Sequence, residues 1–293
     1  MTGVFRKVSG LVFEKLSGDI SLMHSKRLLG NLLRPSPRRC GIMLVSGIFL
    51  LIIVGPLLIS QDPLKQDLSL TLCAPGGTHL LGSDHLGRSV LSRLLYGGRS
   101  SLLISFSCTS ISLIIGSFLG VVAGYREGWS DLVVMRLVDG TLAFPGTLLA
   151  IILAGTLGGS MTTLVFALSA TMWCDYCRLV RNMTRSIKQA PHLEAGYLLG
   201  FNAAFLIRRY IFPELTPQLF TLASLGMGRT ILNISGLGFL GIGLQPPLPE
   251  WGSMINQGIG FMSEAPWLVI VPGILIFLAV FGFQLMAGAP HER

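Results

Sequence analysis

Long uncharged stretches alternate with charged segments along the chain. No Asp, Glu, Lys or Arg occurs in residues 40–61, 100–125, 140–174, 230–249 or 265–291, and Arg229 alone separates a sixth stretch, 215–228, from the fourth of these. An α-helix needs about 20 apolar residues to cross a bilayer. The pattern therefore predicts an all-α integral membrane protein with six transmembrane helices, near 42–60, 101–124, 132–155, 160–178, 216–243 and 267–287.

The positions of Lys and Arg predict the orientation of these helices, because such residues stay preferentially on the cytoplasmic side. Eight lie in residues 1–39 and six in 178–209, whereas 244–266 has none. We expect both termini inside. The predicted parts are a cytoplasmic N-terminal segment (1–39), a transmembrane domain (40–288) with external segments 61–99 and 244–266 and a cytoplasmic loop 179–214, and a short cytoplasmic tail (289–293). The N-terminal segment is either an amphipathic helix on the inner leaflet or a poorly ordered tail.

Composition supports a membrane protein. Hydrophobic residues make up 51% of the chain and charged residues 12%, against about 25% charged in soluble domains. The net charge of +8 does not indicate nucleic-acid binding, because the bases flank apolar stretches. Five cysteines, an odd number, do not predict a disulfide framework, and Cys174 and Cys177 are interpreted as small packing residues.

Three segments predict structure beyond the simple spans. Helical spacing of apolar residues over 84–96 predicts an external amphipathic helix that leads into the second span. Gly140, Pro145 and Gly146 predict a break in the third span. The cytoplasmic loop contains two short helical candidates, 190–199 and 202–211, with Gly200 as the turn between them and Pro213 closing the second.

No catalytic motif accompanies this pattern. The sequence contains no Gly-Lys-Ser/Thr phosphate-binding loop, no His-Glu-x-x-His and no Gly-x-Ser-x-Gly. We therefore expect a transport protein rather than an enzyme, driven by a partner protein or an ion gradient.

Four sequence motifs, taken together, resemble one known family. They are residues 81–97; Met135-Arg136 with Asp139 and Phe144-Pro145; Glu194-Ala195-Gly196 with Gly200 and Ile211-Phe212-Pro213; and residues 238–243 followed by Pro246-Pro247 and Pro249-Glu250-Trp251-Gly252. The set resembles the second permease subunit of bacterial peptide and nickel ABC importers over most of residues 40–285. The chain departs from the family pattern at Ser83, Ser89, Gly196 and Phe212, and in its short C-terminal tail.

The resemblance implies a type I ABC importer permease fold and a set of partners. These are a second homologous permease subunit, two ATPase subunits that carry ATP and Mg²⁺, an external solute-binding protein and the lipid of the bacterial inner membrane. The chain itself would bind no cofactor, metal or nucleic acid. The resemblance assigns coupling to the ATPase to Glu194, Ala195, Gly196, Gly200 and Pro213, and the external motifs to Asp84, Gly87, Arg88, Pro247, Glu250 and Trp251.

Structural interpretations compete with these roles. Asp84 and Arg88, four residues apart, could form a helix-stabilising pair worth about 0.3–0.5 kcal/mol, and Arg136 could pair with Asp139 in the same way. Trp251 could anchor a helix end at the lipid headgroups.

Two functional questions remain open at the level of the sequence, the energy source and the cargo. An ion-gradient-driven secondary transporter would place acids or broken helices at the bilayer midplane, whereas Asp139 and Asp175 are predicted near the inner ends of their spans. The cargo could be a peptide, nickel or a metal chelate, and residues 233–238 resemble the nickel and metallophore members more than the peptide members.

Arg229 is the one base placed near the middle of a predicted span. A charge at such a position must face protein or water. Arg229 and Asn233 are the candidate residues of a translocation path, in which Arg229 would attract carboxylates of the cargo. The alternative is a structural pair with a carbonyl group or with the partner permease.

Overall fold

The computed structural model describes residues 36–59, 61–77 and 79–288. The predicted tail and nearly all of the predicted N-terminal segment lie outside these ranges. In chain order, the helices are α2 (Pro37–Leu58), α3 (Val90–Arg126), α4 (Gly128–Leu142), α5 (Gly146–Leu157), α6 (Met161–Lys188), α7 (Pro191–Leu198), α8 (Ala203–Leu206), α9 (Phe212–Phe239), α10 (Trp251–Ile259) and α11 (Trp267–Ala287). Two short turns, η1 (Leu68–Leu70) and the π-helical η2 (Ile207–Ile211), complete the set.

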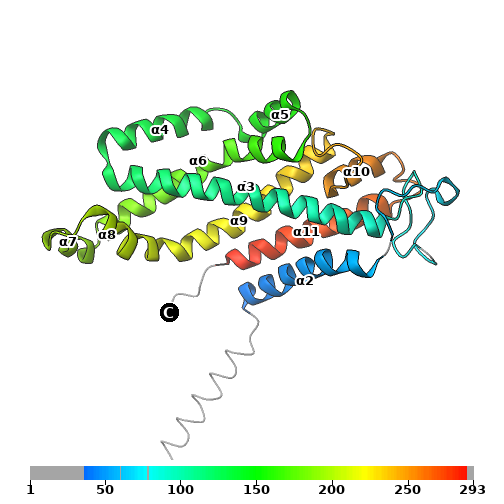
Figure 1. Cartoon of the computed structure of the whole chain (residues 1–293), viewed down its shortest axis with the longest axis horizontal. Helices are drawn as coiled ribbons and strands as arrows, with labels where there is room; N and C mark the ends of the chain where they lie inside the picture. The colour runs from blue at the N-terminus through cyan, green and yellow to red at the C-terminus, as the bar shows by residue number, and fades with distance from the viewer. Residues whose placement is uncertain (1–35, 60, 78, 289–293) are drawn as a thin grey trace, which may run out of the picture.

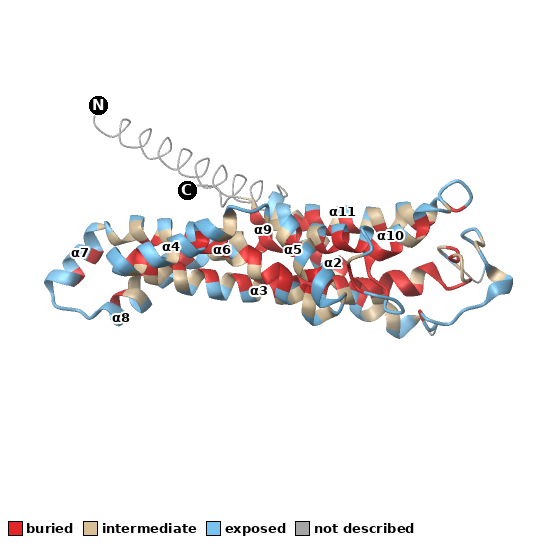
Figure 2. Cartoon of the chain, turned by 90° about the horizontal axis from the view of Figure 1, so that it is seen from above, coloured by how far each residue is buried: buried red, intermediate tan, exposed pale blue. Residues whose placement is uncertain are grey.

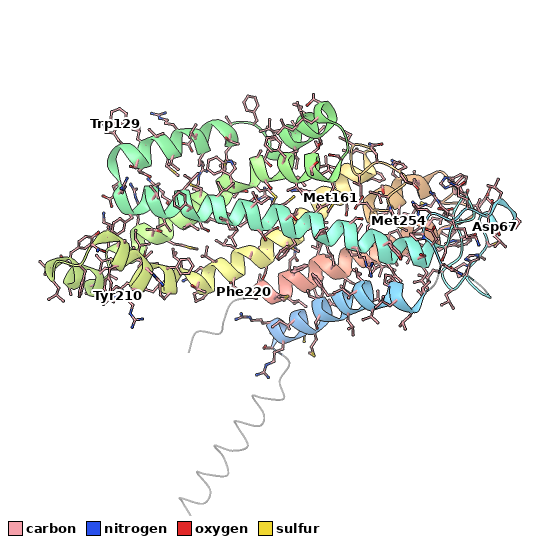
Figure 3. The ribbon with its side chains drawn as sticks, in the orientation of Figure 1. Asp67, Trp129, Met161, Tyr210, Phe220 and Met254 are labelled. Carbon is pink, nitrogen blue, oxygen red and sulfur yellow. The ribbon has the colours of Figure 1, made fainter. Side chains whose placement is uncertain are left out.

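The helices form an elongated bundle with two different ends. Figure 1 shows α7 and α8 at one end, and α10 with the segment between α2 and α3 toward the other. Figure 3 shows Trp129 and Tyr210 toward the first end, and Asp67 and Met254 toward the second. The segments predicted to lie on opposite sides of the membrane are therefore separated along the bundle.

The closest helix packing joins α3 to α6. Gly116, Gly120 and Gly124 form one stripe on α3, and a Cβ atom at any of them would lie 2.6–2.7 Å from a backbone oxygen of α6. Small residues four apart allow two membrane helices to approach closely without a hydrophobic driving force. The glycine stripe therefore accounts for the close contact between α3 and α6.

Helices α2 and α11 form a second closely packed pair. A Cβ at Gly41 would lie 2.5 Å from the backbone nitrogen of Met286, and one at Gly282 would lie 2.8 Å from the side chain of Val45. Figure 2 shows buried residues along the middle of the bundle and around α10, whereas the end formed by α7 and α8 is mostly exposed.

Three helices are long and apolar enough to cross a membrane, namely α2, α3 and α11. The pair α4 and α5 adds a fourth crossing if the two together form one bent span. The two further predicted spans are present as helices α6 and α9, which do not meet the same test in the described residues. Both carry charged side chains within the helix.

The predicted break in the third span is confirmed. Helices α4 and α5 meet at an angle of 77°. Pro145 precedes the first residue of α5, and a proline disfavours helical conformation in the residue before it. Gly140 lies inside α4 and takes no part in the break.

The external amphipathic helix predicted over 84–96 is wrong in its first half. Helix α3 begins at Val90, with the Ser89 side chain accepting a hydrogen bond from the backbone N–H of Ser92. Gly87 has φ +71° and lies so close to Asp67 that a side chain there would clash with its backbone. The chain before Ser89 is therefore a turn, and the second half of the predicted segment belongs to α3 itself.

Ion pairs connect α6 to α4 and to Glu127, the residue before α4. Asp131 accepts hydrogen bonds from two arginines of α6, at 2.6 and 2.7 Å, and Asp139 pairs with Arg178 at 2.6 Å. The expected Arg136–Asp139 pair is therefore wrong. The two arginines that bind Asp131 are Arg181 and Arg185. A further ion pair joins Lys188 of α6 to Glu127.

The interpretation of Cys174 and Cys177 as packing residues is confirmed. Both thiols are free and buried, in a small cluster with Val138 of α4.

Candidate functional site

A cleft between α5, α6 and α9 contains both residues that the sequence proposed for a translocation path. Its volume is about 370 Å³. Arg229 and Asn233 line it from α9, where a separation of four residues places them on one helical face. The lining is otherwise mostly apolar, with Ile151, Leu168, Met172, Leu232 and Leu240 among its side chains.

Arg229 forms an ion pair with Asp175 of α6, with Nη1 and Oδ2 2.5 Å apart. The side chains of Arg229 and Asp175 are 60% and 36% exposed, so both can be reached from the cleft. The structural alternative for Arg229 is thus realised within this chain, with a carboxylate rather than a carbonyl group or the partner permease.

Asp175 is the cleft residue that sequence reasoning missed. Helix α6 continues to Lys188, so Asp175 lies near its middle rather than at its inner end. Its position therefore does not argue against an ion-driven carrier. The sequence carried only an indirect signal: Asp175 and Arg229 each lie at the edge of an uncharged stretch, where a charge needs a partner, but Asp139 lies at such an edge as well.

The segment predicted to couple to an ATPase forms a helical hairpin. Helix α7 spans Pro191–Leu198 and the second arm begins at Ala203, with Gly200 between them at φ +79°. This confirms the two short helices and the turn. A positive φ favours glycine because other residues are strained there.

The hairpin has a buried base and an exposed apolar tip. Leu193 of α7 packs with Leu206 and Ile211 in one buried cluster. Leu198 and Leu199 at the tip are 86% and 73% exposed.

The coupling residues divide in the same way. Glu194 and Ala195 are exposed. Gly196 is buried, and a Cβ there would lie 2.7 Å from the Leu206 side chain. The side chains of the first two are therefore accessible at the surface, whereas Gly196 allows the two arms of the hairpin to pack closely.

The sequence predicted that Pro213 closes the second arm of the hairpin, and this prediction is wrong. Pro213 lies in the first turn of α9, where its missing N–H is tolerated. The π-helical turn η2 runs directly into α9. The hairpin is therefore continuous with the helix that carries Arg229.

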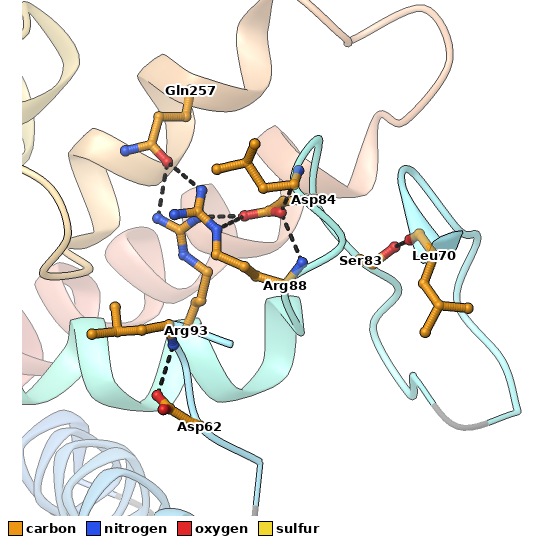
Figure 4. A network of polar contacts seen from close by, with 9 residues as sticks. Asp62, Leu70, Ser83, Asp84, Arg88, Arg93 and Gln257 are labelled. Atoms are coloured by element: carbon orange, nitrogen blue, oxygen red, sulfur yellow. Dashed lines mark hydrogen bonds and ion pairs between the residues drawn. The ribbon is translucent and has the colours of Figure 1, made fainter. Parts of the chain in front are cut away.

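At the opposite end, Asp84 organises a buried polar network (Figure 4). Its Oδ2 accepts from Arg88 Nε at 2.7 Å and from Arg93 Nη1, and both arginines also donate to Gln257 Oε1, at 3.2 and 2.9 Å. The Asp84–Arg88 pair exists, but in a buried turn rather than on a helix surface. Burial acts to raise the pKa of Asp84, but the backbone N–H of Arg88 and the charge of Arg93 outweigh it and hold that pKa below its usual value.

Glu250 caps α10 and is fully buried. Its carboxylate accepts hydrogen bonds from the backbone N–H groups of Gly252 and Ser253, at 2.9 and 2.8 Å, and from the hydroxyl of Ser101 at 3.1 Å. Burial raises the pKa of Glu250 although these three donors favour the ionised form. A Cβ at Gly238 would lie 2.2 Å from Glu250 Oε2, which explains a glycine there.

Trp251 is buried inside the bundle and is not a headgroup anchor. Its side chain is 0% exposed and its Nε1–H donates to the carbonyl oxygen of Leu94 at 2.9 Å. Pro247, two residues before Pro249, follows a cis peptide bond in the connection to α10. These external motifs therefore pack the end of α9 against α3.

Comparison with known families gives the identity. Residues 116–289, more than half of the chain, match the family described as binding-protein-dependent transport system inner membrane component. The chain belongs to this family. The match includes the cleft, the hairpin and the Glu250 motif of this permease, whereas the Asp84 network begins before it.

Three relatives match most of the permease. A dipeptide transport system permease protein from Alkalihalophilus pseudofirmus is 35% identical over 246 residues, covering 84% of this chain and 81% of the relative. A glutathione transport system permease protein from Pectobacterium atrosepticum is 39% identical over 212 residues, covering 72% and 70%. A nickel transport system permease protein from Escherichia coli is 31% identical over 255 residues, covering 87% and 92%.

A solved structure shares the fold. A chain of the MetNI methionine ABC transporter, in inward-facing conformations, aligns with a TM-score of 0.52 and 16% identity, covering 66% of this chain and 94% of that chain.

These comparisons confirm the resemblance that the motifs carried. The permease is a multi-pass membrane protein and a transport subunit rather than an enzyme. Its family, rather than the position of its acids, distinguishes it from an ion-gradient-driven secondary transporter.

Proposed function

We propose that this permease forms one half of the translocation path of an ATP-binding-cassette importer, with a second homologous permease subunit as the other half. One observation carries the proposal: a mostly apolar cleft that contains an Arg–Asp ion pair is connected, through the continuous helix α9, to an exposed helical hairpin. Two ATPase subunits would bind ATP and Mg²⁺, and one of them would dock on the hairpin. An external solute-binding protein would deliver the cargo to the opposite end.

The hairpin tip is suited to docking in a groove of another protein. Exposed apolar side chains that cluster at one place on a surface mark interaction sites. Leu198 and Leu199 are such side chains, next to the exposed Glu194 and Ala195. Because η2 leads directly into α9, a displacement of the hairpin would reach the cleft through one helix.

The orientation we propose has six crossings and both termini in the cytoplasm. Helices α6 and α9 would supply the two crossings beyond the apolar ones. The charges of α6 are compatible with this role because they pair with acids of α4, and paired charges inside a helix bundle are tolerated in membranes. The domain boundaries proposed are those of the sequence: 1–39, 40–288 and 289–293.

The cargo we propose is a small peptide or nickel, which are kinds of cargo named for the relatives, or a metal chelate. A metal-chelating cargo is the version suggested by residues 233–238. Arg229 and Asn233 would contact the cargo during its passage.

The coupling role is tested by placing a charge on the hairpin tip. Leu198→Asp in the complete complex should reduce co-purification of the ATPase and ATP-dependent uptake into liposomes by about tenfold or more. An unpaired carboxylate buried in an apolar contact costs more than the roughly 1.4 kcal/mol that corresponds to a tenfold loss of affinity.

Trp129→Ser is the matched control, because Trp129 is 81% exposed at the same end of the bundle but lies outside the hairpin. Uptake by wild type must require both ATP and the binding protein. Normal assembly and uptake by Leu198→Asp would exclude the hairpin tip as the docking surface, and uptake driven by an ion gradient without ATP would exclude the importer.

A further inference from the structure

The charges of the cleft balance each other. Among its lining residues, Asp175 and Arg229 are the charged ones, one acid and one base. Thr147, Thr171 and Asn233 supply neutral polar groups. A cleft of this kind offers no net charge to attract a simple cation or anion, but it offers one site for each sign.

The ion pair that joins the two charges can be opened. Exposed pairs contribute little to stability because water solvates the separated ions, and the Arg229 and Asp175 side chains are 60% and 36% exposed. Within the described residues, a single hydrogen bond joins the pair, donated by Nη1 of Arg229 to Oδ2 of Asp175. The other guanidinium N–H groups and the second carboxylate oxygen remain available to a ligand.

A ligand with one carboxylate and one ammonium group fits this arrangement best. Its carboxylate can take both donors of the Arg229 fork, and its ammonium group can take Asp175. Each charge of the cleft then exchanges one partner for another, so no ion is left unpaired among apolar side chains. A ligand with a single charge would satisfy one residue and leave the other without a partner.

A free divalent cation fits poorly. Hard cations need several oxygen ligands, and nickel prefers nitrogen donors such as imidazole. Asp175 is one carboxylate with a guanidinium beside it. Among the described residues, no group of three or more His, Cys, Asp or Glu side chains could hold a metal ion.

We propose that the Arg229–Asp175 pair is an exchangeable recognition site for zwitterionic peptides, with Arg229 binding the C-terminal carboxylate and Asp175 the N-terminal ammonium group. Asn233, one turn from Arg229 on the same face of α9, hydrogen-bonds the peptide group between them. The proposal rests on the proposed function, because it assigns the cargo to the path described there. It selects peptides from the three kinds of cargo considered.

The test measures binding directly, so that the preference of the binding protein plays no part. Dialanine, its N-acetyl derivative, its C-terminal amide and nickel chloride are titrated calorimetrically into the purified permease–ATPase complex, with and without a non-hydrolysable ATP analogue. Wild type should bind dialanine most tightly. Each derivative should bind about tenfold more weakly, since each lacks one charged hydrogen-bonding group.

Two variants should lose this discrimination separately. In Arg229→Gln, affinity for dialanine should fall about tenfold while affinity for the amide stays within about twofold. In Asp175→Asn, affinity for dialanine should likewise fall, while affinity for the N-acetyl derivative stays within about twofold. Arg178→Gln removes an arginine from another exposed Arg–Asp pair, outside the cleft, and should leave the order of the ligands unchanged.

Equal losses for all ligands in both cleft variants would assign the pair a structural role and overturn the proposal. So would the absence of dialanine binding in both nucleotide states, or tighter binding of nickel chloride. Uptake in liposomes with ATP and the binding protein is measured in parallel. Retained ATP-dependent uptake with no such recognition would refute this site while leaving the permease function intact.

Discussion

At the scale of single residues, the end of the permease that is predicted to be external depends on carboxylates that are buried with their hydrogen-bond partners. Glu250 accepts from three donors and Asp84 from two arginines and two backbone N–H groups. Removing a buried acceptor leaves its donors unsatisfied, which costs more than the hydrogen bonds contributed. The two residues should therefore be sensitive to substitution although neither contacts the cleft.

Glu250→Leu should destabilise the permease by at least about 2 kcal/mol, because the first N–H groups of α10 and the Ser101 hydroxyl lose their acceptor. Thermal unfolding of the purified complex measures the loss. Glu264→Leu is the control, since Glu264 is exposed in the same external segment. Equal melting temperatures for the two variants would show that the Glu250 cap contributes nothing.

The sequence located the unusual residues but not their partners. Arg229 was visible as a lone base in an apolar stretch, yet Asp175 lies 54 positions away. Which acid a base meets depends on how α6 and α9 are rotated about their axes. That rotation is set by packing, and a single sequence carries no direct signal for it. The same reason explains why Asp139 was assigned to Arg136 rather than to Arg178.

At the scale of elements, periodicity predicted where helices lie better than where they begin. The span 267–287 coincides with α11, and both arms of the hairpin were found. The start of α3 was missed because the apolar spacing of 84–96 continues through a turn that Gly87 and Ser89 dictate. The extent of α6 was missed because its charged second half was read as a loop, whereas acids of α4 neutralise it.

Gly120→Ala should destabilise the bundle by about 1–3 kcal/mol, because the added methyl group would lie 2.7 Å from the carbonyl oxygen of Cys177 in α6. Thermal unfolding of the complex in detergent measures this. Gly47→Ala is the control: the substitution is the same, but the expected change in stability has the opposite sign. No atom lies within 4 Å of a Cβ at Gly47, so only the gain of about 0.5–1 kcal/mol in helix propensity remains. A stabilised Gly120→Ala variant would contradict the close α3–α6 contact.

At the scale of the whole molecule, the two ends of the bundle carry different charged groups, which gives the bundle a polarity. The bases of α6 and the hairpin lie toward one end, and the Asp84 network and Glu250 lie toward the other. The cleft lies between them, with Arg229 about 15 Å from the end of α9 by the rise of 1.5 Å per residue. A cargo entering at one end and an ATPase acting at the other would thus share one continuous helix.

This polarity predicts which positions face the outside of the cell. In a variant with its native cysteines replaced, a cysteine at Ser263 should react with a membrane-impermeant maleimide added to intact cells. Replacing Cys73 matters most, because it lies in the segment predicted to be external. A cysteine at Gln189 should react only after the membrane is opened. Both side chains are exposed, so a difference in labelling reports the side of the membrane rather than burial. Gln257 is a less suitable position for the introduced cysteine, because its side chain accepts hydrogen bonds from Arg88 and Arg93. Labelling of Gln189→Cys alone in intact cells would show that the orientation is inverted. Labelling of both cysteines in intact cells would place them on the same side, which would contradict the single crossing by α9 between them.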